Sequence, residues 1–125
     1  MYKPKLEKDI RCPLEYGLDL FGGKWKSRII CVLASQKTLR YGVIRHELHD
    51  ITDAALVTTL KELQAAGIIA RQQFAEIPPK VEYKLTKKGK SIVPILQSIC
   101  KWSGIYYKSD AEKELSQCQK CDYGK

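Results

Sequence analysis

Apolar residues recur at helical spacing in the stretch ITDAALVTTLKELQAAG, which begins at Ile51. Thr52 is a candidate N-cap and Asp53 places a negative charge in the first turn, while Gly67 can adopt the left-handed conformation that ends a helix. Leu56, Leu60 and Leu63 form the apolar face, and the opposite face is small or polar: Ala54, Ala55, Thr58, Thr59, Lys61 and Ala65. This pattern is typical of an ordinary amphipathic surface helix, but it also suits a helix that enters a groove, so the neighbouring elements must decide.

Three further helices are predicted before this segment, over residues 13–21, 24–35 and 41–48. Pro13 suits the first helical position, and Gly22-Gly23 ends the first helix. Residues 36–39 form a connection and residues 49–51 a tight turn. The side chains expected to face inward are Leu14, Leu18 and Phe21, then Trp25, Ile29, Ile30, Val32 and Leu33, then Tyr41, Ile44 and Leu48.

After Gly67 the apolar period changes from 3.6 to 2. Residues 68–74 and 81–85 are predicted strands, and the loop between them contains Pro78-Pro79, which stiffens it. Thr86 caps a last helix over 87–106, with a kink expected at Pro94. The apolar stripe of that helix contains Ile92, Leu96, Ile99 and Tyr106, with Val93, Cys100 and Trp102 beside it.

The predicted fold class is mainly α with a small antiparallel β-hairpin. A short helix, a tight turn and a second helix form a helix-turn-helix, and the hairpin behind it forms a wing. We expect one domain over residues 12–108, a flexible basic arm over 1–11 and a polar, disordered tail over 109–125.

The net charge of +8 is unevenly distributed. Four basic and four acidic residues follow Tyr106, so the whole excess lies in the first 106 residues and indicates a polyanionic partner, most simply nucleic acid. No secretory signal or membrane-spanning run is visible, so a cytoplasmic protein with reduced cysteines is expected. Cys31 and Cys100 lie in apolar runs and are predicted to be core residues.

Several motifs resemble those of the HxlR family of winged-helix transcriptional regulators, which are relatives of the MarR group. They are CPLEYGLDLFGGKW at 12–25, LRYGVIRHEL at 39–48, LKELQAAGII at 60–69 and IPPKVEYKLTKKGKSIVPIL at 77–96. The resemblance implies a homodimer that packs through its first and last helices, most often a repressor, with one recognition helix per subunit in successive major grooves and a wing tip at the adjacent backbone or minor groove.

The sequence departs from the family on the exposed face of the recognition helix, where members often carry a basic or amide side chain. The candidates for base contacts are Ala54, Ala55, Thr58 and Thr59. These residues cannot make arginine–guanine contacts, so the remaining modes of recognition are contacts with thymine methyl groups and recognition of DNA shape. The candidates for phosphate contacts are Lys24, Lys26, Arg40, Arg45, Lys61 and, on the wing, Lys80. Each of them could equally be an ordinary solvated surface charge.

Cys12 is the candidate redox sensor. It precedes Pro13 at the start of a helix and follows Arg11, so unpaired amides and a cation could stabilise its thiolate and raise its reactivity. The family resemblance also implies sensing of oxidants, quinones or aldehydes at this position. The resolving thiol is open: Cys12 of the partner subunit or a tail cysteine.

The tail pair Cys118 and Cys121 has CxxC spacing, which suggests two alternatives: a small thiol redox protein, or a protein-interaction module on the same scaffold. A structural zinc ion needs four ligands, and His46 and His49 are poorly placed to complete the pair, so no metal or other cofactor is expected. No phosphate loop, nucleophile elbow or metal-binding helix motif indicates an enzyme.

Overall fold

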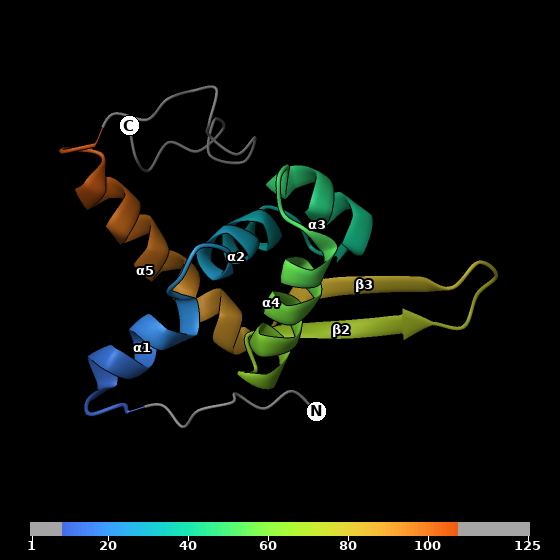
Figure 1. Ribbon diagram of the computed structural model, residues 1–125, viewed down its shortest axis with the longest axis horizontal. Helices are drawn as coiled ribbons and strands as arrows, with labels where there is room; N and C mark the ends of the chain where they lie inside the picture. Colours follow the sequence, from blue (N-terminus) through green and yellow to red (C-terminus); the bar gives the residue numbers. More distant parts are fainter. Residues whose placement is uncertain (1–8, 108–125) are drawn as a thin grey trace.

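The computed structural model describes residues 9–107, so most of the predicted arm and tail, including Cys118 and Cys121, lie outside the described residues. The elements, in chain order, are α1 (Pro13–Phe21), α2 (Lys26–Ala34), β1 (Leu39–Arg40), α3 (Tyr41–Leu48), α4 (Asp53–Ala65), β2 (Ile69–Phe74), β3 (Lys80–Leu85) and α5 (Lys87–Ser103). They form a winged helix-turn-helix, which confirms the predicted fold class. Figure 1 shows the β2–β3 wing extending to one side, with α1 and the end of α5 on the other.

The sheet has three strands in the order β1-β3-β2, where the sequence predicted two. The register places Leu39 opposite Tyr83 and Arg40 opposite Glu82, so the predicted connection over 36–39 ends inside a strand. A two-residue strand shows no alternation, and the pattern therefore could not reveal it. β2 and β3 pair along their whole length, from Ile69–Leu85 at the base to Phe74–Lys80 near the tip.

The core lies between α2, α3, α4, the base of the sheet and the first half of α5. Its buried apolar residues are Ile29, Ile30, Val32, Leu33, Ile44, Leu48, Ile51, Leu56, Leu60, Leu63, Ile68, Ile69, Tyr83, Leu85, Ile92 and Leu96. The predicted inward positions of α2, α3 and α4 are therefore confirmed, with Trp25 and Tyr41 only partly buried against the core. None of the described helices is long and apolar enough to cross a membrane.

Both terminal helices differ from their predicted packing. Leu14 and Leu18 of α1 are exposed, as are Ile99 and Trp102 of α5. α5 ends at Ser103, three residues before its predicted end, and continues through Pro94. A helical stripe shows which face of a helix is apolar but not what covers that face. Several side chains that were predicted to lie in the core are therefore exposed to solvent in the single chain.

The two cysteines that were predicted to be core residues also differ. Cys31 is half-buried against the core, whereas Cys100 is exposed on α5, so the prediction is wrong for Cys100. Cys100 follows Ile99, on the part of α5 that extends beyond the core.

The base of the wing is joined to α5 by Thr86 and Gly89. The Thr86 hydroxyl donates to the carbonyl oxygens of Gly67 and Ile68, 2.6 and 3.0 Å away, and accepts from the Gly89 amide as the N-cap of α5. A Cβ atom at Gly89 would lie 2.2 Å from the Ile68 oxygen, so glycine is needed for this close approach. The end of α4, the wing and α5 are thereby held as one unit.

Candidate nucleic-acid interface

Helix α4 begins with the predicted cap. The Thr52 hydroxyl accepts from the Ala55 amide at 3.1 Å, and Asp53 lies in the first turn. Leu56, Leu60 and Leu63 are buried, which anchors the helix along its length. The opposite side remains in solvent, between α3 and the wing.

Thr59 does not belong to that exposed side. Its side chain is 8% exposed, and its hydroxyl donates to the Ala55 carbonyl oxygen at 2.7 Å. Ala55 is itself half-buried and packs against the core. The expected exposure of Thr59 is therefore wrong, and Ala55 is only partly accessible on the flank of the buried stripe.

The exposed face of α4 is formed by Ala54, Val57, Thr58, Lys61 and Ala65. Val57 was missed by the sequence analysis, although it lies three residues after Ala54 and four before Lys61. Its side chain adds two methyl groups to the face. The surface that α4 offers is thus small and more apolar than predicted, with one cation toward its C-terminal end.

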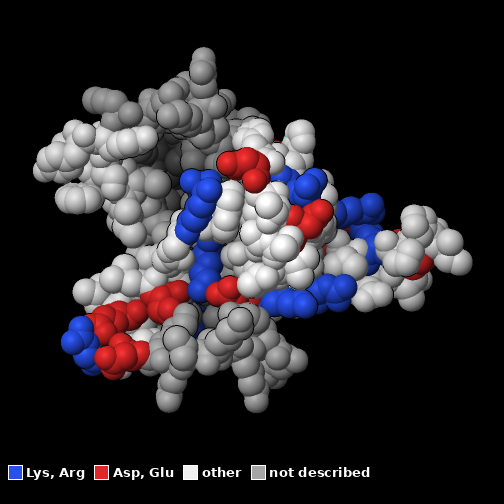
Figure 2. All heavy atoms as spheres, in the orientation of Figure 1, with Lys and Arg blue, Asp and Glu red and all other residues white. Residues whose placement is uncertain are grey.

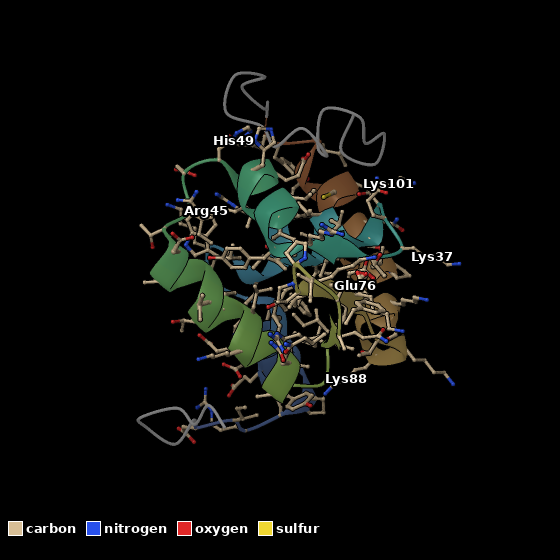
Figure 3. All side chains as sticks on the ribbon, turned by 90° about the vertical axis from the view of Figure 1, so that its right-hand side faces the viewer. Lys37, Arg45, His49, Glu76, Lys88 and Lys101 are labelled. Atoms are coloured by element: carbon tan, nitrogen blue, oxygen red, sulfur yellow. The ribbon has the colours of Figure 1, made fainter. Side chains whose placement is uncertain are left out.

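Asp53 connects α4 to α3 through two contacts. The Tyr41 hydroxyl donates to Asp53 Oδ1 at 2.7 Å, and Arg45 Nε lies 2.9 Å from the same oxygen. Burial, and then the hydrogen bond to Asp53, raise the pKa of Tyr41. Figure 3 shows Arg45 beside the N-terminal end of α4, where its charge is partly compensated by Asp53.

The other predicted phosphate ligands differ in how accessible they are. Lys24, Arg40 and Lys61 are exposed, and Lys24 Nζ lies 4.6 Å from the centre of the Trp25 ring. Lys80 is paired with Glu82 at 3.3 Å. On the face that carries α4, basic and acidic side chains alternate and do not form one continuous basic patch (Figure 2).

Lys26 is a structural side chain, and its expected exposure is wrong. It is 17% exposed, pairs with Glu62 of α4 at 3.3 Å and donates to the Asp19 carbonyl oxygen of α1 at 3.2 Å. Lys88 makes a similar bridge, because its Nζ donates to Tyr16 of α1 and to the Ala66 carbonyl oxygen just after α4. Two lysines therefore connect α1 to the C-terminal half of α4.

The wing contributes basic side chains that the sequence analysis did not select. Arg71 of β2 and Lys84 of β3 are exposed, and each stands in a strand rather than at the tip. At the tip, Ile77 is fully exposed beside Glu76. The sequence could have indicated Arg71 as a candidate, because it is a basic residue within a predicted strand of the wing.

Cys12 is exposed at the N-cap of α1, as predicted, but its thiol makes no capping hydrogen bond. The Arg11 guanidinium pairs with Glu15 at 3.0 Å, and the Arg11 amide also donates to that carboxylate. Those bonds lower the pKa of Glu15. The cation expected to act on Cys12 is therefore shared with a carboxylate of the same helical turn.

A helix-turn-helix with an exposed second helix and a wing is the arrangement found in DNA-binding regulators. The model of the HxlR-like helix-turn-helix family matches residues 20–111. The chain belongs to that family. It is accordingly a transcriptional regulator and not an enzyme, as the sequence predicted.

Among relatives of this HxlR-like regulator is an uncharacterized HTH-type transcriptional regulator of Methanothermobacter thermautotrophicus, 44% identical over 95 residues, which are 76% of this chain and 72% of the relative. Among solved structures, the redox regulator HypR in its oxidized form is 35% identical with a TM-score of 0.71, over 78% of this chain and all of HypR. The reduced form of the regulator YodB from B. subtilis is 32% identical with a TM-score of 0.71, over 81% of this chain and all of YodB.

Proposed function

We propose that the protein is a homodimeric repressor that acts in the cytoplasm by binding a palindromic DNA operator, with one α4 helix per subunit in successive major grooves. The observation that carries the proposal is the exposed face of α4, anchored on one side by buried leucines and placed between α3 and the wing. Its short side chains let the helix backbone approach the floor of the groove closely, so Ala54, Val57 and Thr58 meet thymine methyl groups and base edges.

The homodimer is supported by the apolar side chains that α1 and the end of α5 leave in solvent. Leu14 is 69% and Trp102 is 66% exposed, and exposed apolar side chains in this number are typical of an interface. The other members are Tyr16, Leu18, Ile95, Ile99, Ile105, Tyr106 and Tyr107. Both helices lie on the side away from the wing, so a two-fold axis there leaves α4 of each subunit accessible (Figure 1).

The experiment that tests this function is selection of bound sequences from random duplexes, followed by measurement of binding against salt. The expected result is a palindrome with half-sites about 10 base pairs apart, whose affinity falls steeply with salt because phosphate contacts release counterions. Insertion of the operator upstream of a promoter should then lower transcription in vitro. A protein-interaction module would enrich no sequence and show no steep salt dependence with any duplex.

A second function, redox control through Cys12, is favoured by two observations. The thiol is exposed at the start of α1, and α1 is tied to Glu62 of α4 through Lys26 and to the residue just after α4 through Lys88. Oxidation would join the Cys12 sulfur to a second thiol, and the two electrons and two protons would pass to an oxidant such as a quinone, which becomes a hydroquinone. The resolving thiol is Cys12 of the partner subunit or a cysteine of the tail.

Cys12→Ser tests this control, with Cys31→Ser as the matched variant because Cys31 lies half-buried. Diamide should reduce operator binding of the wild type and of Cys31→Ser but leave Cys12→Ser unaffected, and thiol should restore binding. Non-reducing electrophoresis distinguishes the resolving partners, since a Cys12–Cys12 bond links two subunits. A Cys12→Ser protein that still responds to diamide would contradict sensing at this residue.

A further inference from the structure

A pocket lies between the end of α2, the base of the wing and the start of α5. Its volume is about 650 Å³, within the usual range for small-molecule sites. The lining residues are Leu33, Ala34, Ser35, Gln36, Lys37, Thr38, Lys84, Leu85, Lys90 and Val93. Pairing of β1 with β3 stops at Leu39–Tyr83, so residues 35–38, which connect β1 to α2, leave the last two residues of β3 unpaired on this side and line the pocket together with them.

The walls of this pocket combine an apolar floor with a cationic rim. Leu33, Leu85 and Val93 contribute the branched apolar side chains of the lining, with Leu33 and Leu85 buried and Val93 half-buried. Lys37, Lys84 and Lys90 line the same space, and none of the ten lining residues is acidic.

The three lysines come from three different elements: the loop after α2, strand β3 and helix α5. None of them forms an ion pair with a carboxylate within the part of the chain that the structure describes. Three cations around one pocket, with no acidic side chain in its lining, favour an anion over a cation as its occupant.

Favourable interaction of a cation with a helix C-terminus explains only one of the three lysines. Lys37 follows the C-terminus of α2, where a cation suits the helix dipole. The last carbonyl groups of α2 are already bonded, however, since the Ser35 hydroxyl donates to the Val32 oxygen at 2.8 Å and the Gln36 amide to the Leu33 oxygen at 3.3 Å. Lys84 and Lys90 have no such role.

We propose that this pocket binds a small organic anion, an aromatic or branched carboxylate whose hydrocarbon body rests on Leu33, Leu85 and Val93 and whose carboxylate is held by the lysine rim. Thr38 and Gln36 add neutral hydrogen-bonding groups at the edge. Figure 3 shows Lys37 on the opposite side of the molecule from α4. Lys37 therefore lies away from the α4 face proposed to enter the major groove, and binding can be tested on the protein alone.

The test uses 2-naphthoate as the probe and 2-naphthalenemethanol as its uncharged counterpart, with amide chemical shifts followed by NMR at physiological salt. Saturable shifts are expected around Thr38 and Leu85, with at least about tenfold weaker binding of the alcohol, because a charge-assisted contact contributes on the order of 1.4 kcal/mol or more. Lys84→Gln and Lys90→Gln should each weaken 2-naphthoate binding about threefold, as expected for partly exposed ion pairs.

Lys101→Gln is the matched control, because Lys101 is an exposed lysine of α5 that does not line the pocket. It removes the same charge from the same helix and should leave affinity unchanged. Equal binding of the alcohol would overturn the proposal because the lysines would then not hold the carboxylate. Equal effects of Lys101→Gln and Lys90→Gln, or shifts that do not saturate, would overturn it because the lysines would then attract anions only as part of the general positive charge.

Discussion

Replacement of Asp53 by asparagine should strengthen nonspecific DNA binding. The carboxylate is 67% exposed at the start of α4 and holds Arg45, which is 49% exposed, at 2.9 Å. Asparagine still accepts the Tyr41 hydrogen bond but no longer attracts the guanidinium. Arg45 then becomes available to a phosphate group, and the negative charge that opposes the DNA backbone disappears.

The magnitude follows from one additional phosphate contact. Each contact adds about 0.9 to the slope of log affinity against log salt, so Asp53→Asn should steepen the slope by about 0.9 and raise affinity about tenfold at about 50 mM salt. The cost in stability is small, about 1 kcal/mol, because the pair is exposed and the acidic side chain contributes modestly to the helix dipole. Melting temperature should fall by about 4–8 °C at most.

Fluorescence anisotropy with a labelled nonspecific duplex over about 50–200 mM salt measures this effect. Asp50→Asn is the matched control, since it removes a carboxylate from the preceding turn without releasing Arg45. The double variant Asp53→Asn/Arg45→Gln should return to the wild-type slope. An Asp53→Asn slope equal to that of the wild type, or a double variant as steep as Asp53→Asn, would refute the release of Arg45.

Three further results are expected. Thr58→Asp should abolish operator binding with little change in melting temperature. Thr59→Asp should instead destabilise the fold by about 3 kcal/mol or more in urea unfolding, because it buries an unpaired charge. If Thr58→Asp unfolds the protein and Thr59→Asp only abolishes binding, Thr59 and not Thr58 faces the DNA. Gly89→Ala should lower the free energy of unfolding by about 1–3 kcal/mol in the same assay, because the new Cβ atom would lie 2.2 Å from the Ile68 carbonyl oxygen. A Gly89→Ala protein as stable as the wild type would show that the backbone at this junction moves to accommodate the Cβ atom. Tyr41 stabilises the fold fully below about pH 10, and since its pKa is raised in the folded state, that contribution is lost as pH rises through the folded value. Between pH 9 and 11, Tyr41→Phe should therefore lose less stability than wild type in urea unfolding. An equal loss in both proteins would show that ionisation of Tyr41 does not affect folding stability.

The order of helices and the wing could be predicted because the apolar period changes from 3.6 to 2 after Gly67. The burial of Thr59 was also visible in principle, since it lies at i+3 from Leu56 and i−4 from Leu63, within the buried stripe. Its residue type, rather than its position, led to the wrong assignment. The strand Leu39–Arg40 left no periodic signal at all.

Charge could be read from the sequence, but pairing could not. Lys26 and Arg45 both looked like candidate phosphate ligands, yet their partners Glu62 and Asp53 come from another helix. Such contacts depend on how helices cross, which local spacing does not specify. The lysine-lined pocket is hidden for the same reason, because its three lysines are brought together only by the fold.

The most direct test of α4 as the reading helix is a thymine-to-uracil scan of the selected operator, because uracil differs from thymine only by the missing methyl group. At least one symmetry-related position per half-site should lose about fourfold in affinity, the value of one buried methyl contact. That sensitivity should vanish in Val57→Ala or Thr58→Ser and persist in Ala65→Ser, a change further along the same helix. An operator that is insensitive at every thymine, or a sensitivity that is unchanged in both Val57→Ala and Thr58→Ser, would contradict methyl readout by this face.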